Sequence, residues 1–184
     1  MTVDLAPVPG AAAAAGRILE RFRSRKAFFT ARLRAADPAG LAPGVAFRVA
    51  YVGLDDLNGD DWLISAGRTR LWRVVVAAGA SPVAVVEVEQ GDDEGWRFVT
   101  LNEGPLLQEV NDALAAACAR EEFRAGSFEP ILLAIPSADM TAIWFRQRDG
   151  EGDRLLLVDP SRGTLLEPEA VRDLAQRKAR RDGI

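Results

Sequence analysis

Apolar residues recur at helical spacing in three segments of the chain. The first segment runs from about residue 11 to residue 36 and ends at Asp37-Pro38, because the residue before a proline is forced out of the helical region. Its apolar stripe consists of Ile18, Leu19, Phe22, Phe29 and Leu33. The second segment covers residues 104–120, and the third covers residues 168–181. This spacing predicts three helices, of which the first is amphipathic.

Seven shorter segments alternate between apolar and polar residues or are apolar throughout, which is typical of strands. They cover residues 45–52, 71–77, 83–89, 96–101, 130–135, 141–147 and 154–159. Hairpin-length turns separate most of these segments, and such turns favour antiparallel pairing. We therefore expect an α+β fold with a mostly antiparallel sheet of about five to seven strands, arranged as two three-strand meanders, with three helices packed on one face.

Length and composition favour a single globular domain. The chain has 184 residues, of which 48% are hydrophobic and 27% are charged. Residues 1–15 are rich in alanine and proline and are predicted to be a flexible N-terminal segment. Residues 16–184 are predicted to form one α+β domain that begins with the amphipathic helix. The acidic segment 55–61 does not have the spacing of a calcium-binding loop and is expected to be a solvated turn.

The absence of histidine limits the chemistry that the chain can perform. Without histidine there is no Ser-His-Asp triad, no Cys-His pair and no imidazole base. The single cysteine, Cys118, cannot form a thiolate zinc site alone, and no glycine-rich phosphate loop is present. The sequence therefore predicts no catalytic residues, no metal site and no cofactor, and it disfavours an enzyme.

Charge is distributed unevenly along the chain. Residues 1–36 carry seven basic and two acidic side chains, whereas residues 37–166 carry 11 basic and 21 acidic ones. The candidate residues for contact with a partner lie on the first helix: Arg17, Arg21, Phe22, Arg25 and Phe29. Packing of this helix on the chain's own domain is the favoured interpretation, followed by a protein partner or a homo-oligomer and then by an anionic membrane. Nucleic acid is disfavoured because lysines and aromatic platforms are few and the net charge is −4.

A pair of carboxylates, Glu87 and Glu89, interrupts an otherwise apolar strand. Residues two apart in a strand share a face, so these two side chains could line a ligand pocket or an acid–base site together with Arg73 and Arg97. The favoured alternative is that they keep the sheet soluble and lie opposite those two arginines on neighbouring strands.

These features predict a non-catalytic protein-interaction or accessory domain. One alternative is a small-molecule-binding domain or an enzyme that uses the carboxylate pair, and another is an immunity or inhibitor protein with an acidic target-blocking surface. The chain has 21 arginines and two lysines, which indicates a bacterial source, and no apolar segment long enough to span a membrane. A lone cysteine and the lack of a signal-peptide pattern favour the cytoplasm.

Overall fold

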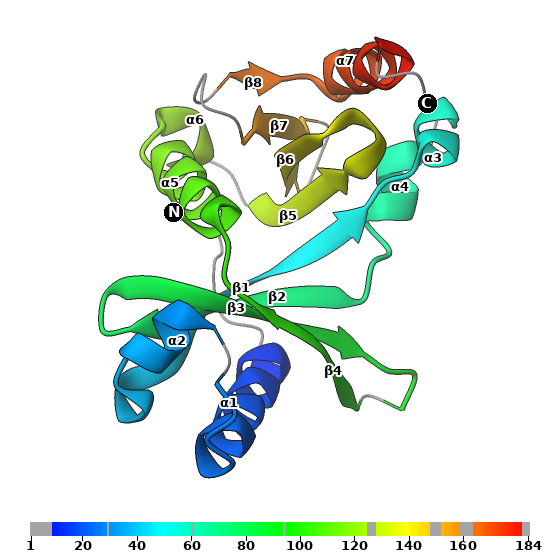
Figure 1. The fold of residues 1–184 in the computed structure, drawn as a ribbon. Coiled ribbons are helices and arrows are strands. Elements are labelled where there is room, and N and C mark those ends of the chain that lie inside the picture. Colours follow the sequence, from blue (N-terminus) through cyan, green and yellow to red (C-terminus); the bar gives the residue numbers. More distant parts are fainter. Residues whose placement is uncertain are drawn as a thin grey trace. The chain divides into compact units, whose positions relative to one another are not determined.

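The chain divides into two compact units, and the residues of strand β1 (Leu41–Tyr51, labelled in Figure 1) are divided between them after Phe47. The N-terminal unit comprises the described residues of Leu5–Phe47 and Arg70–Gln108, and the C-terminal unit comprises those of Arg48–Thr69 and Glu109–Ile184. The computed structural model describes residues 9–28, 30–59, 61–93, 95–124, 128–147, 152–158 and 164–181. Each unit has its own hydrophobic core.

The N-terminal unit is a sheet covered by helices. Its strands follow the order β4-β3-β2-β1, where β2 is Leu71–Ala78, β3 is Ser81–Gln90 and β4 is Trp96–Asn102. The helices are α1 (Pro9–Ser24) and α2 (Ala31–Ala35), and a short 3-10 turn η1 (Pro38–Gly40) leads into β1. The apolar stripe of α1, which includes Ala11, Ala15 and Leu19, packs on the valines of β2 and β3.

The hairpin between β2 and β3 closes through Gly79 and Ala80. Gly79 has φ +61°, a left-handed conformation that glycine adopts without a steric cost. The hairpin predicted between the segments 71–77 and 83–89 is thereby confirmed.

Glu103, which directly follows β4, accepts hydrogen bonds from the first residues of α2. The backbone N–H groups of Leu33 and Arg32 donate to its carboxylate at 2.6 and 3.1 Å, and the Thr30 hydroxyl donates to it as well. Burial alone would raise the pKa of Glu103, but these hydrogen bonds and the charge of Arg32 together hold that pKa below its ordinary value. Thr30, the residue at the N-cap position of this five-residue helix, makes no capping hydrogen bond with its own side chain. The carboxylate of Glu103 therefore caps the N-terminus of α2 in its place.

We predict that Glu103→Gln lowers the free energy of unfolding at neutral pH by about 1–2 kcal/mol. Because the folded-state pKa of Glu103 lies below the unfolded-state value, its contribution is present at neutral pH and is lost as the pH falls through the folded-state pKa. Urea unfolding of both proteins between about pH 7 and pH 3 checks this. The two stability curves should converge in acid, and a gap that persists or widens there would contradict the prediction.

The C-terminal unit is built around the order β1-β5-β6-β7-β8. Its strands are the second half of β1, β5 (Phe128–Ile135), β6 (Met140–Gln147), β7 (Arg154–Leu157) and β8 (Leu165–Leu166). Its helices are α3 (Leu54–Asn58), α4 (Trp62–Ala66), most of α5 (Pro105–Cys118), α6 (Glu121–Arg124) and α7 (Pro168–Arg181), and the 3-10 turn η2 (Pro136–Ala138) joins β5 to β6. The antiparallel β5–β6 and β6–β7 pairs agree with the second predicted meander.

Both faces of this second sheet are buried. On one face Ile131, Leu133 and Trp144 form a core with residues of α3, α4 and α7. On the other face Phe123 of α6 packs on Phe145, with ring centroids 4.4 Å apart, and on Phe128. Strand residues of both alternating sets are therefore apolar, which explains why β5 is apolar throughout most of its length.

The α+β class and the mostly antiparallel pairing are confirmed, but the sheet prediction was wrong in two respects. Strands β1 and β5 pair in parallel, with Arg48 opposite Ile131, and the residues that the structure describes form eight strands rather than five to seven. The described part of the chain also contains more helices than the three predicted. The parallel pair joins strands far apart in sequence, and such pairing leaves no local turn signal.

The predicted helix over residues 11–36 is two helices. Lys26 adopts φ 51°, and Ala27 N–H then donates to the Phe22 carbonyl at 2.9 Å, which closes the end of α1. Glycine is the usual residue in this conformation at a helix end, so a lysine at position 26 does not predict that the helix ends there. Helix α1 also begins at Pro9, within the segment predicted to be flexible, and residues 1–8 lie outside the described residues. A single folding domain stays a prediction.

The acidic segment after β1 was also predicted wrongly as a turn. Leu54–Asn58 forms α3, in which Asp56 accepts a hydrogen bond from Gly53 N–H at 2.8 Å, and α4 follows directly. Buried Leu57 and Trp62 anchor these short helices on the sheet, so tertiary packing overrides the polar composition.

Candidate functional site

The carboxylates of β3 do not share one site, because each has its own arginine. Glu87 is only 4% exposed and accepts from Arg73 Nε at 3.0 Å and from Arg73 Nη2 at 2.5 Å. Glu89 pairs with Arg97, which lies directly opposite it on β4. Both pairs follow the strand register, as expected for cross-strand partners.

A hollow of about 430 Å³ lies where β3 turns into β4. Glu89 and Arg97 line it, together with Arg70, Asp92 and Trp96, whereas Glu87 and Arg73 do not. A hydrogen bond and the charge of Arg70 hold the pKa of Asp92 below its usual range, so this carboxylate is ionised at neutral pH. Use of Glu87, Glu89, Arg73 and Arg97 on a ligand stays a prediction.

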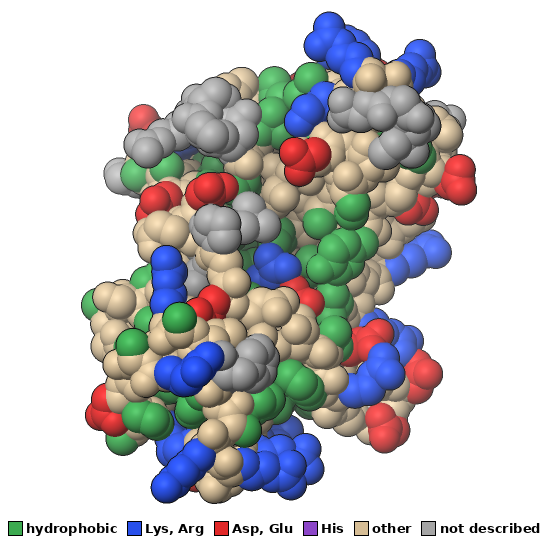
Figure 2. All heavy atoms as spheres, viewed as in Figure 1, with side chains coloured by type: hydrophobic (Ala, Val, Ile, Leu, Met, Phe, Trp, Pro, Cys, Tyr) green, Lys and Arg blue, Asp and Glu red, His purple; other side chains and the backbone are tan. Residues whose placement is uncertain are grey.

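The basic side of α1 faces solvent. Arg17, Arg21 and Arg25 are exposed and make no ion pair with any residue that the structure describes. Arg23 instead pairs with Glu20 at 2.5 Å and donates to the Pro38 carbonyl. Figure 2 shows Lys and Arg side chains gathered over α1 and α2 at the bottom of the view. The helix therefore packs on its own unit through its apolar stripe, while most of its charge stays unneutralised.

Two exposed apolar residues lie on β4, a strand that packs against α1. Phe98 and Val99 on the edge strand β4 are 41% and 45% exposed. The ring of Phe22 meets Phe98 edge-on at a centroid distance of 5.8 Å and stacks on Phe28 at 6.1 Å. Phe22 therefore packs partly against its own unit. Phe29, the other predicted phenylalanine, lies outside the described residues. We call Arg17, Arg21, Arg25, Phe98 and Val99 the α1–β4 surface.

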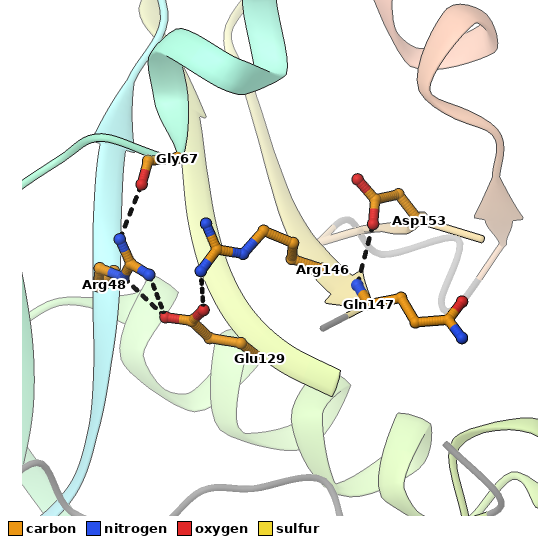
Figure 3. Close-up of polar contacts among 6 residues, drawn as sticks. All are labelled: Arg48, Gly67, Glu129, Arg146, Gln147 and Asp153. Carbon is orange, nitrogen blue, oxygen red and sulfur yellow. Dashed lines mark hydrogen bonds and ion pairs between the residues drawn. The ribbon is translucent and has the colours of Figure 1, made fainter. Parts of the chain in front are cut away.

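A second candidate site is a groove of about 810 Å³ in the C-terminal unit. We call it the α4–α7 groove, after the helices at its two ends. Residues from α4, from β6 and from the start of α7 line this groove. They are Leu63, Ile64, Gly67 and Arg68 from α4 and the segment after it, Trp144, Arg146 and Gln147 from β6, Gly152, Asp153 and Arg154, and Glu167, Pro168 and Glu169. Asp153 accepts from Gln147 N–H at 2.9 Å and so orders the end of β6 (Figure 3).

An ion cluster lies at one side of the α4–α7 groove. In Figure 3, Arg48 on β1 and Arg146 on β6 reach the carboxylate of Glu129 from the two strands that flank β5. Arg48 donates to Glu129 Oε1 at 2.5 and 2.7 Å and to the Gly67 carbonyl at 2.7 Å, whereas Arg146 donates to Oε2. Two guanidinium groups therefore share one carboxylate, and the cluster carries one surplus positive charge.

Sequence patterns did not reveal this cluster. Arg48 and Glu129 are 81 positions apart, and their strands meet only through the parallel β1–β5 pair. The sequence shows only that Glu129 is a charged residue at the start of an apolar strand. Many solvent-exposed residues occupy such positions, so this position does not indicate a buried ion pair.

Neither surface contains a recognisable catalytic arrangement. Among the described residues no three side chains of the metal-ligating types come together, and no helix there is long and apolar enough to cross a membrane. No protein-family model matches the chain, and no curated protein or solved structure is significantly similar to it.

Proposed function

We propose that the chain is a non-catalytic protein-interaction domain whose α1–β4 surface binds an acidic, partly apolar polypeptide. The observation that carries this proposal is a set of exposed arginines, Arg17 and Arg21 on α1 and Arg25 directly after it, that make no ion pair with any described residue, next to the strand that exposes Phe98 and Val99. Arginine and aromatic residues are enriched at protein interfaces, where guanidinium groups bind carboxylates through two parallel hydrogen bonds.

The apolar component favours a polypeptide over nucleic acid. Single strands of nucleic acid bind by stacking their bases on aromatic side chains. The ring of Phe98 is already in contact with Phe22, and Val99 has no aromatic ring on which a base could stack. An acidic segment with interspersed apolar side chains matches both the charge and the apolar part of the surface. The cytoplasm of a bacterium is the location we propose, on the sequence evidence of a lone cysteine and an arginine-rich composition.

A titration that compares three anionic probes tests the proposal. We expect the full chain to bind fluorescently labelled poly-L-glutamate, with affinity that falls about tenfold or more between about 50 and 300 mM salt. Random-sequence duplex DNA and vesicles with phosphatidylserine should bind more weakly at each salt concentration. If DNA or vesicles bind more tightly than poly-L-glutamate, the proposed polypeptide partner is wrong and the partner is a nucleic acid or a membrane.

Phe98→Ser tests the apolar component separately. We expect this change to weaken binding of a peptide that alternates glutamate and leucine by about three- to tenfold, because burial of the ring is lost. The same change should leave binding of poly-L-glutamate nearly unaltered, as measured by fluorescence anisotropy. Equal loss for both peptides would mean that Phe98 acts through the fold and not through contact.

A further inference from the structure

The ion cluster beside the α4–α7 groove holds more positive charge than its own carboxylate neutralises. Both oxygens of Glu129 are taken, one by Arg48 and one by Arg146. Arg146 uses a single terminal nitrogen for this contact, so its other N–H groups have no acceptor among the described residues. The Arg146 side chain is 33% exposed and lines the groove. Its spare donors are therefore available to a bound molecule.

Neighbouring groups hold Arg146 in place. Its guanidinium carbon lies 5.9 Å from the ring centroid of Trp144, a favourable cation–π distance. A Cβ at Gly67 would lie 3.2 Å from Trp144 Cη2 and 3.3 Å from Arg146 Nη1, so glycine at this position lets both side chains approach the end of α4. An arginine fixed in this way loses little side-chain entropy when it binds an anion.

The rest of the groove supplies a second cation and an apolar wall. Arg68 follows Gly67, is exposed and makes no ion pair with any described residue. Leu63 and Ile64 of α4 line the groove beside Trp144, and Ile64 is largely exposed. At the other end Arg154 and Glu167 neutralise each other at 3.0 Å, and Glu169 is acidic. Asp153, a further carboxylate in the lining, accepts from the Gln147 N–H, so among the described lining residues the cations outside the Arg154–Glu167 pair are Arg68 and Arg146.

We propose that the α4–α7 groove binds a small organic monoanion with an apolar body. Its carboxylate would accept hydrogen bonds from Arg146 and Arg68, and its apolar body would lie along Leu63, Ile64 and Trp144. A groove of about 810 Å³ falls within the size range of small-molecule sites. The planar guanidinium fork suits a carboxylate, and the acidic far end disfavours a second negative charge on the ligand. This site is in a different unit from the α1–β4 surface and does not depend on the proposed function.

A nuclear magnetic resonance titration tests this site with 4-phenylbutyrate as the probe. The chain has four tryptophans, and the indole N–H signal of Trp144 is assigned as the one that Trp144→Phe removes. We expect 4-phenylbutyrate to shift that signal saturably, with a Kd of about 0.1–5 mM. The uncharged 4-phenylbutyramide should bind at least about tenfold more weakly, because it cannot form the charged hydrogen bonds.

Variants localise the binding. Arg146→Ala leaves the Arg48–Glu129 pair intact, and Arg68→Ala changes an exposed side chain, so both should fold. Each is expected to weaken 4-phenylbutyrate about tenfold or more, whereas Arg177→Ala, an exposed arginine on α7 outside the groove, should not. The proposal is overturned if 4-phenylbutyrate produces no saturable shift, if the amide binds equally well, or if Arg68→Ala has no more effect than Arg177→Ala.

Discussion

Glu129→Ala is expected to lower the free energy of unfolding of the C-terminal unit by about 3–5 kcal/mol. The change removes the only carboxylate between Arg48 and Arg146 in the described cluster and leaves two partly buried guanidinium groups close together. Their repulsion adds to the cost of losing the hydrogen bonds that both guanidinium groups donate to Glu129. Urea unfolding followed by tryptophan fluorescence measures the difference, since Trp144 lies beside the cluster.

The matched control is Glu167→Ala. Glu167 also pairs with an arginine, Arg154, but its side chain is exposed, so its loss should cost no more than about 1 kcal/mol. If Glu129→Ala costs as little as this control, the cluster is a solvated surface pair and does not order the side of the groove where Arg146 lies.

The second large effect concerns Glu87, the most buried charged residue that the structure describes. Glu87→Ala should destabilise the N-terminal unit by about 3–5 kcal/mol, because Arg73 is left in a largely buried site without its partner. The double variant Arg73→Met/Glu87→Leu should recover most or all of this loss of stability, since apolar residues of similar volume need no desolvated charge. Thermal or urea unfolding of the set gives the comparison.

Glu89→Ala is the control for this set. Its pair with Arg97 is largely exposed, so the expected cost is about 1 kcal/mol or less. A double variant as unstable as Glu87→Ala would show that the pair contributes something that apolar packing cannot replace. A requirement of this kind would favour the ligand-binding interpretation of Glu87 and Arg73.

Local patterns were sufficient for most of the strands and for the last two long helices. Helix α7 begins and ends at the predicted residues, because an apolar stripe, an acidic first turn and a basic last turn agree there. The break after Ser24 could not be predicted, since a lysine in the left-handed conformation closes α1. Helices α3 and α4 could not be predicted either, because packing on the sheet and not composition maintains them.

The candidate sites divide in the same way. Arg73 opposite Glu87 and Arg97 opposite Glu89 follow from hairpin register, which short turns make visible in the sequence. The cluster of Arg48, Glu129 and Arg146 depends on a parallel pairing between distant strands, so no local pattern contains it. The exposure of Arg17 and Arg21 on α1 depended on which face of the helix the sheet buries, and Ile18, Leu19 and Phe22 of the predicted stripe lie on that face.

One comparison tests the central proposal most directly. Charge reversal of Arg17, Arg21 and Arg25 to glutamate removes the basic part of the α1–β4 surface. The same reversal of Arg177, Arg180 and Arg181, which are exposed on α7, changes the net charge equally at a different site. Binding of labelled poly-L-glutamate at about 100 mM salt should fall at least about tenfold in the α1 variant and no more than about twofold in the α7 variant. Equal loss in the two variants would mean that net charge, and not the α1–β4 surface, determines binding.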